Sequence, residues 1–190
     1  MEKQPSYRPS RDVPRQRTAG RPGHPWRIGV LAVVFVAIIA VFFKSVHVLM
    51  AESVKKEKVL FAHIVRPGDK FSTGYIHSVE LSPVREFFHI DERFRIVLYE
   101  TTFRSSNVGL PYAAFGQEVF HTEADKFRIT NMHRILPELL IWANKKYENN
   151  LEFRGVFMAL YGVEDDDLIR VHLTDMPLIK LACLIFRDTG

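Results

Sequence analysis

Apolar residues form one unbroken run near the start of the chain and then recur in short segments. Residues 28–43 read IGVLAVVFVAIIAVFF, without a polar side chain, and apolar residues resume as Val46, Val48, Leu49 and Met50. A helix needs about 20 residues to span a bilayer, and counting from Trp26 to about His47 supplies them. The pattern therefore predicts a transmembrane signal anchor at residues 28–50.

Beyond residue 59 the pattern changes to segments in which apolar and polar side chains alternate, separated by turn-forming Gly, Pro, Asp and Asn. Such alternation is typical of strands with one buried face. No stretch sustains a helical period, so we expect a mostly β protein, with a single antiparallel β-sandwich or barrel-like domain at 59–190. Only residues 131–137 and residues 164–170 have a pattern that is compatible with a short helical turn. The expected strands are VLFAHIV, KFSTGYIHSVEL, VREFFHI, FRIVLYETTF, KFRIT, ELLIWA, RGVFMALYGV, DLIRVHL and LIKLACLIF.

Positive charge is concentrated before the apolar run. Residues 1–27 carry seven basic and two acidic side chains, which leaves 19 basic and 20 acidic residues in the rest of the chain. The body thus lacks the basic excess that would hold a phosphate backbone, and nucleic-acid binding is not expected. The tail is rich in Pro, Arg and Ser, so we expect it to be disordered and, by the positive-inside rule, cytoplasmic.

This charge distribution predicts a single-pass protein of the cytoplasmic membrane, with a charged linker at 51–58 and the domain that follows on the extracytoplasmic side. A cleaved signal peptide is the alternative, because the letters AES at 51–53 weakly fit a cleavage site near Ser53. The long basic segment before the run, and an apolar stretch beyond the usual length of about 7–15 residues, favour an uncleaved anchor.

The cysteine content excludes two kinds of site. Cys183 is the only cysteine, so the chain has no internal disulfide and no cysteine-based metal site. It lies within the apolar segment LIKLACLIF, where a small buried hydrophobic side chain is the expected role.

A candidate site lies in the segment TGYIHSVELSPVREFF, residues 73–88, and depends on strand register. If the first hairpin turns at 81–82 and the second at 92–94, His77 lies opposite Glu86, and Glu86 lies opposite Glu100. These three polar side chains would then form one row at the edge of the core, next to an aromatic and apolar row. The members of that second row are Tyr75, Phe88 and Leu98.

Three interpretations of the polar row remain open. His77 and Glu86 could form a hydrogen-bonded pair that sets the register, or the carboxylates of Glu86 and Glu100 could hold a ligand or a divalent cation. The third is acid–base catalysis by His77. Ser78 is no partner for the imidazole if the strand continues, because alternation sends the two side chains to opposite faces.

Motifs of the common enzyme classes are missing from the sequence. It contains no Gly-x-Ser-x-Gly elbow, no zinc-type histidine spacing and no phosphate-binding glycine loop. The acidic run EDDD at 164–167 lacks the spaced oxygen ligands of a calcium loop, so a solvated turn is expected there. We therefore do not predict an enzyme, and we predict no cofactor beyond the divalent cation considered above.

The same residues carry a resemblance. GDKFSTGYIHSVELSPVREFF, ETTFRSSNVGLP and ITNMHRILPELLIW, within residues 59–145, resemble the bacterial family of domain of unknown function 1850. The resemblance implies a small protein anchored by one N-terminal apolar segment, without established enzymatic activity. It also implies an accessory role in solute uptake, because genes of this family commonly neighbour those of TRAP transporters of the TAXI type.

The resemblance extends to single residues. The recurring polar residues of the family correspond to His77, Ser78, Glu80, Glu86 and Glu100, and a second motif contains Gly109 and Pro111. This chain has Asn-Val-Gly-Leu-Pro at the second motif, where the family usually has Gly-Ala-Gly-Leu-Pro, and the segment after residue 145 resembles the family poorly.

Together, these observations predict a membrane-anchored extracytoplasmic accessory or ligand-sensing component of a TRAP/TAXI-type transport system, with transporter subunits as partners. Two alternatives remain. One is a metal-dependent or acid–base enzyme centred on His77, Glu86 and Glu100, and the other is a structural envelope module that binds only protein.

Overall fold

The computed structural model describes residues 25–104, 115–163 and 166–188. The chain divides into two units, Met1–Ile38 and Ile39–Gly190. Gly109 and Pro111, and nearly all of the basic tail, lie outside the described residues.

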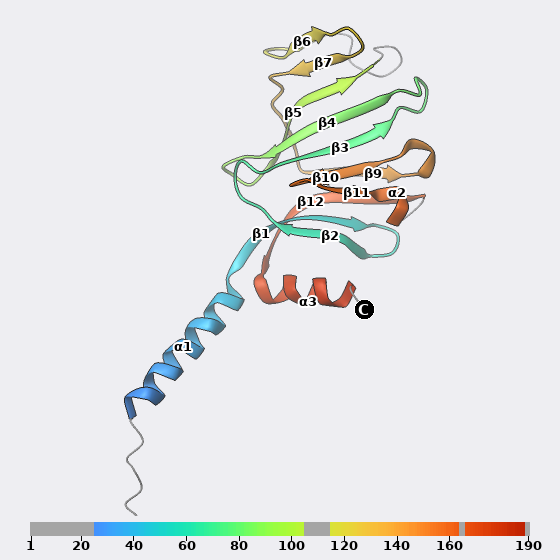
Figure 1. Ribbon diagram of the computed structural model, residues 1–190. Coiled ribbons are helices and arrows are strands. Elements are labelled where there is room, and N and C mark those ends of the chain that lie inside the picture. Colours follow the sequence, from blue (N-terminus) through green and yellow to red (C-terminus); the bar gives the residue numbers. More distant parts are fainter. Residues whose placement is uncertain (1–24, 105–114, 164–165, 189–190) are drawn as a thin grey trace, which may run out of the picture. The chain divides into compact units, whose positions relative to one another are not determined.

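Strands dominate the second unit, as the alternating pattern predicts (Figure 1). The strands are β1 (Ser45–Ser53), β2 (Lys58–Ile64), β3 (Lys70–Ile76), β4 (Pro83–Ile90), β5 (Ile96–Phe103), β6 (Val119–Thr122), β7 (Phe127–Thr130), β8 (Arg134–Leu136), β9 (Glu138–Ala143), β10 (Asn150–Phe153), β11 (Val156–Ala159) and β12 (Asp167–Pro177). The helices are α1 (Pro25–Phe43), the 3₁₀ turn η1 (Lys145–Tyr147), α2 (Leu160–Val163) and α3 (Leu178–Asp188).

These strands form two sheets. Sheet A has the order β2-β1-β12-β9, and sheet B has the order β11-β10-β3-β4-β5-β7-β6, with β8 paired to β5. Every strand pair among the described residues is antiparallel, and neither sheet closes on itself. The prediction of a mostly antiparallel β domain is confirmed, and its barrel-like variant is wrong because both sheets keep free edges.

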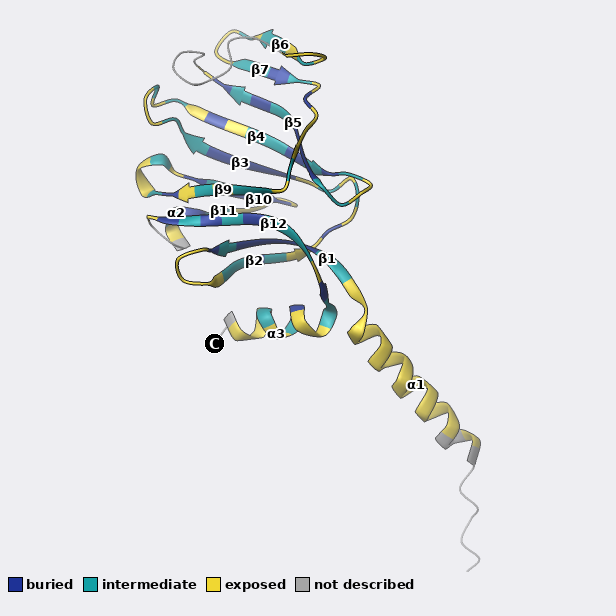
Figure 2. Cartoon of the chain, turned by 180° about the vertical axis from the view of Figure 1, so that it is seen from behind, coloured by how far each residue is buried: buried dark blue, intermediate teal, exposed yellow. Residues whose placement is uncertain are grey.

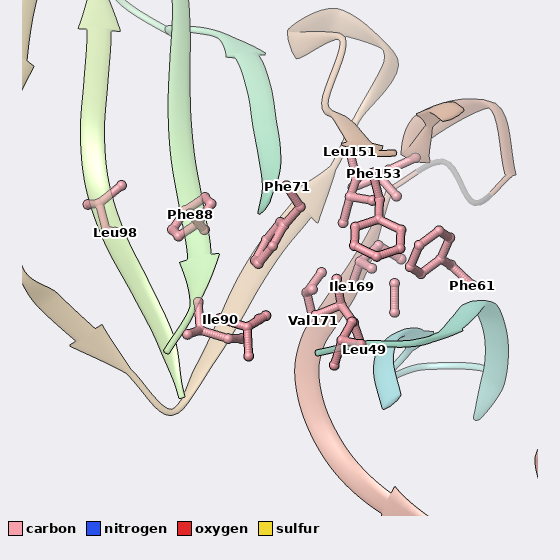
Figure 3. Close-up of a cluster of buried hydrophobic side chains, with 14 of the residues drawn as sticks. Leu49, Phe61, Phe71, Phe88, Ile90, Leu98, Leu151, Phe153, Ile169 and Val171 are labelled. Atoms are coloured by element: carbon pink, nitrogen blue, oxygen red, sulfur yellow. The ribbon is translucent and has the colours of Figure 1, made fainter. Parts of the chain in front are cut away.

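The two sheets share one hydrophobic core. Side chains of sheet A and of sheet B belong to the same buried cluster, and Figure 3 shows them converging. The rings of Phe71 and Phe88 stack with centroids 4.8 Å apart, and Phe61 meets Phe153 edge to face at 5.7 Å. Aromatic pairs of this kind contribute about 0.5–1.5 kcal/mol beyond their burial.

The apolar run forms α1, whose residues from Gly29 to Phe43 are exposed (Figure 2). Within the part of the chain that the structure describes, no helix combines the length and the hydropathy required to cross a membrane. The predicted limit of the anchor at residue 50 is wrong, because β1 begins at Ser45 and both Val48 and Leu49 are 0% exposed. The predicted linker at 51–58 is also wrong, since it holds the end of β1, a turn and the start of β2.

Burial on both faces of sheet A explains why residues 46–50 read as a continuation of the apolar run. Leu49 points into the core between the sheets, whereas Val48 and Met50 belong to a second cluster that α3 covers. A strand buried on both faces loses the alternation that distinguishes it from a helix.

The segment LIKLACLIF forms α3 instead of the predicted strand. Its Leu181 and Leu184 pack against the second cluster, three residues apart as on one face of a helix. Cys183 is exposed, contrary to the predicted burial. A short apolar run does not by itself discriminate strand from helix, and here Pro177 ends the preceding strand.

The two positions predicted to allow helical turns hold strands. β8 lies within 131–137, and β12 begins inside 164–170, where Asp167 is buried and not part of a solvated turn. The short helical turns are η1 and α2, in segments where the pattern predicted a polar break and the end of a strand.

Candidate functional site

The first hairpin brings different residues together from those predicted. In the β3–β4 pair, Tyr75 lies opposite Val84 and Thr73 opposite Glu86, so His77 is not the partner of Glu86. β3 ends at Ile76. The predicted register is wrong by four positions, which preserves the face of each side chain but exchanges its neighbour.

Residues 77–82 form the turn between β3 and β4. The amide of His77 donates to the carbonyl of Ser82, and the amide of Leu81 donates to the carbonyl of His77, both at 2.9 Å. Leu81 takes a φ of 48°, in the left-handed region. The turn therefore begins earlier than a pattern of alternating residues indicates.

The second hairpin contains a β-bulge. Phe88 lies opposite Leu98 as predicted, but beyond the register shift Glu86 lies opposite Thr101, and Glu100 opposite Phe87. One extra residue on a bulged strand sends the following side chains to the other face. Glu100 thus points away from Glu86, and its carboxylate lies 3.9 Å from the guanidinium of Arg128. The predicted row of His77, Glu86 and Glu100 does not exist.

A different polar row faces the core. Thr73, Glu86 and Thr101 lie side by side on β3, β4 and β5, and the two threonines are buried. Thr101 Oγ1 contacts Met132 Sδ at 3.6 Å, and Thr73 Oγ1 donates to Glu86 Oε2 at 3.5 Å. The signal for Thr73 was present in the sequence, since it shares the parity of the inward-facing Tyr75.

Glu86 opens onto a cleft of about 480 Å³ between the two sheets. β3 and β4 form one side of this cleft, and β9, at the edge of sheet A, forms the other. The lining consists of residues 73–78 and Glu86 on the first side, and of residues 140–142, Tyr147 and Asn149 on the second.

Burial dominates the electrostatics of Glu86. It raises the pKa of this carboxyl, against the hydrogen bond from Thr73 and the positive charge of Arg134, which both lower it. The guanidinium of Arg134 is engaged elsewhere, 2.8 Å from the carboxylate of Glu118. Burial, and then the charge of Glu86, raise the pKa of Tyr75 to about 12. Within the described residues, no basic side chain forms an ion pair with Glu86.

The comparisons with known proteins concern this region. Residues 71–160 match the model of a family described as Domain of unknown function (DUF1850). This part of the chain resembles DUF1850. Every residue that lines the cleft, from Thr73 to Asn149, lies inside the match. No curated protein and no solved structure matches the chain.

The limits of the DUF1850 match correct the expected ones. The match begins at residue 71 instead of 59, and it continues to 160, through the segment after 145 that was expected to resemble the family poorly. β10, β11 and η1 therefore belong to the matched domain.

His77 lines the cleft of the region that resembles DUF1850, but one of its nitrogens is occupied. Nδ1 accepts hydrogen bonds from the amides of Glu80 at 3.2 Å and Val79 at 3.4 Å. The proton of the neutral ring is then on Nε2, which remains a donor. This imidazole is suited to donate a hydrogen bond to a ligand and poorly suited to act as a base.

The remaining predicted residues divide between the cleft and its surroundings. Ser78 lines the cleft beside His77, and because both lie in a turn, the alternation that was expected to separate them does not apply. Glu80 contributes its amide to the turn and is not part of the lining.

A metal centre finds no support among the described residues, which contain no group of three or more His, Cys, Asp or Glu side chains able to hold an ion. The two carboxylates considered for a divalent cation, Glu86 and Glu100, point to opposite faces of sheet B.

Proposed function

We propose that this chain is a membrane-anchored extracytoplasmic component of a solute transport system, with an accessory or ligand-sensing role, and that the cleft at Glu86 binds a small ligand. The observation that carries the binding proposal is a half-buried carboxyl group that opens onto a cleft and forms no ion pair with a basic side chain among the described residues. A buried charged group without a partner is costly, so it is retained where it serves a function.

Binding is a better explanation of the cleft than catalysis. The Nε2 atom of His77 offers a donor, Glu86 offers an acceptor or, when protonated, a donor, and Trp142 adds aromatic surface. A few convergent polar groups in a partly apolar cleft are typical of small-molecule sites. The arrangement lacks a nucleophile activated by a free base, since the Nδ1 atom of His77 is already bonded to backbone amides.

Two features support membrane anchoring. The large apolar side chains of α1 from Val30 to Phe43 are exposed, and basic residues of the N-terminal tail precede the helix, which by the positive-inside rule would keep that tail in the cytoplasm. The polar-free run at 28–43 is shorter than the about 20 residues of a complete span, so Trp26 and Lys44 would lie at headgroup depth. With this arrangement, the β domain would lie outside the cytoplasmic membrane.

The link to transport depends on the resemblance to DUF1850, whose genes commonly neighbour those of TAXI-type TRAP transporters. Co-purification of the chain with transporter subunits from mild detergent would support this part of the proposal. Isolation of the chain alone, with an intact cleft, would instead favour a sensor that acts without a stable complex.

Calorimetry tests the binding proposal. The full chain is used, because a fragment that starts at residue 51 would remove most of β1. The chain in detergent is titrated with divalent cations, small carboxylates and small amines, and we expect binding heat with one of these classes. We expect Glu86→Gln to lower that affinity at least tenfold.

Glu100→Gln is the matched control, since it removes a carboxylate one strand away on the opposite face of the sheet. We expect this variant to bind like the wild type. An equal loss in both variants, or no heat from any class, would contradict a ligand site at Glu86.

A further inference from the structure

Helix α3 is apolar on two opposite sides. Leu181 and Leu184 face sheet A and complete the second hydrophobic cluster. Ile179, Cys183 and Phe186 follow each other at intervals of four and three residues, which places them together on the side that faces away. Ile179 is 41% exposed and Phe186 is 78% exposed.

One apolar stripe is sufficient for a helix that covers a sheet. The outer face of such a helix is normally polar, and contiguous exposed apolar surface marks an interaction site. By its exposure, the second stripe of α3 is a candidate interaction surface. Figure 2 shows the contrast between the buried and exposed sides of this helix.

The position of α3 indicates what this surface contacts. The amide of Leu178, its first residue, donates to the carbonyl of Lys44 at 3.1 Å. Lys44 directly follows α1, whose last residue is Phe43. The start of α3 is thus held within one hydrogen bond of the point where the exposed apolar run ends.

The charges beside the outer stripe fit a lipid surface. Lys180 is exposed on α3, Arg187 lies in the last turn, and the first turn contains no acidic residue. Helices that lie in the membrane interface combine an apolar face, which enters the headgroup region, with Lys and Arg side chains that contact anionic lipid. Lys44 adds a third basic side chain at the same end of the domain.

We propose that α3 lies in the interface of the membrane that α1 enters, with Ile179, Cys183 and Phe186 inserted at headgroup depth. This inference depends on the membrane anchoring proposed above and is independent of the cleft. It gives the β domain a second attachment to the bilayer and so restricts its orientation relative to the membrane.

The single cysteine makes the proposal testable in the full chain. The protein is reconstituted in vesicles of phosphatidylcholine with a minority of phosphatidylglycerol, and Cys183 is labelled with an environment-sensitive fluorophore. We expect a blue-shifted emission that is quenched by a lipid carrying its quencher near the headgroup and protected from aqueous iodide.

A second label position is the control. Ala124→Cys in a Cys183→Ser background places the fluorophore in the exposed turn between β6 and β7, at the edge strand of sheet B. We expect iodide, and not the lipid quencher, to quench this label. Ile179→Gln should weaken lipid quenching at Cys183 at least twofold without lowering the melting temperature, since the replaced side chain faces outward.

The outcomes separate this inference from the anchor. If the chain fails to float with the vesicles, the anchoring proposal is overturned. If it floats while iodide quenches the Cys183 label freely, only the interfacial position of α3 is overturned. The label could instead quench itself, and this self-quenching could disappear when the ratio of lipid to protein is raised. That result would identify a contact between copies of the chain and would also overturn the lipid proposal.

Discussion

Replacing Glu86 by glutamine distinguishes a binding carboxyl from a structural one. Burial raises the pKa of Glu86 above its ordinary value of 4.5, so the fold favours the protonated form. A raised pKa contributes stability that is fully present below the ordinary value and is lost as the pH rises through the value in the folded protein. Glutamine has nearly the shape of the protonated acid and does not ionise.

The expected result follows from this sign. At about pH 4 the Glu86→Gln variant should be as stable as the wild type, because the wild-type carboxyl is then largely protonated. Above pH 4.5 the wild type should lose up to about 1.4 kcal/mol per pH unit relative to the variant, until Glu86 is ionised in both states. Near neutral pH we expect the variant to be more stable by about 1–3 kcal/mol, the cost of a poorly compensated buried group.

Urea unfolding of the full chain at a series of pH values measures this difference. Glu100→Gln serves as the control, and its stability should stay within about 0.5 kcal/mol of the wild type. Glu100 forms a long ion pair with Arg128, at 3.9 Å on the partly exposed face, and such pairs contribute little to stability. A Glu86→Gln variant that loses stability near neutral pH would refute the reasoning. Such a loss would mean that the carboxylate is a satisfied structural group, and the cleft would lose its main evidence for a ligand.

Three further substitutions, one of them with a control variant, test the fold of the β domain. Ser53→Ala removes the hydroxyl that donates to buried Asp167; we expect a loss of about 1–3 kcal/mol in urea unfolding. Burial alone would raise the pKa of Asp167, but this bond and two backbone amides lower it, so the loss should shrink as the pH falls through that pKa. Leu81→Gly relieves a positive φ of 48° and should raise the melting temperature, with a gain of about 1 kcal/mol in stability. The control Val79→Gly, in the same turn, should instead lose about 0.5–1 kcal/mol. Equal effects of the two substitutions would contradict the turn geometry. Phe88→Ala empties a fully buried position and should cost about 3–5 kcal/mol in the same unfolding assay, and a cost below 1 kcal/mol would contradict a shared core.

Local pattern was sufficient for most strands of the matched domain. The alternation in FRIVLYETTF and VREFFHI identified β5 and β4, and it paired Phe88 with Leu98 correctly. Apolar and polar side chains alternate over much of both strands, with the more buried ones on one face, so the side-chain period of two is visible in the letters. Composition alone also established that basic residues are not in excess outside the N-terminal tail.

The failures at β1 and α3 have a common cause in contacts between distant segments. Apolar residues of β1 and α3 pack against each other in the second hydrophobic cluster. β1 therefore lacks the alternation that identifies a strand, and α3 lacks the single apolar stripe that identifies a helix. An apolar run next to a suspected anchor was therefore assigned to the anchor, although β12, more than a hundred residues later, supplies its partner strand.

The candidate site shows the same division between local and distant information. The sequence by itself determined which strand carries Glu86 and which face of that strand its side chain occupies, because both depend only on the alternation along β4. The neighbours of Glu86 were decided by tertiary structure, through the early end of β3 and the bulge opposite Phe87. The cleft itself exists because the edge strand β9 of sheet A lies across from β3, and packing between two sheets has no trace in the pattern of either strand.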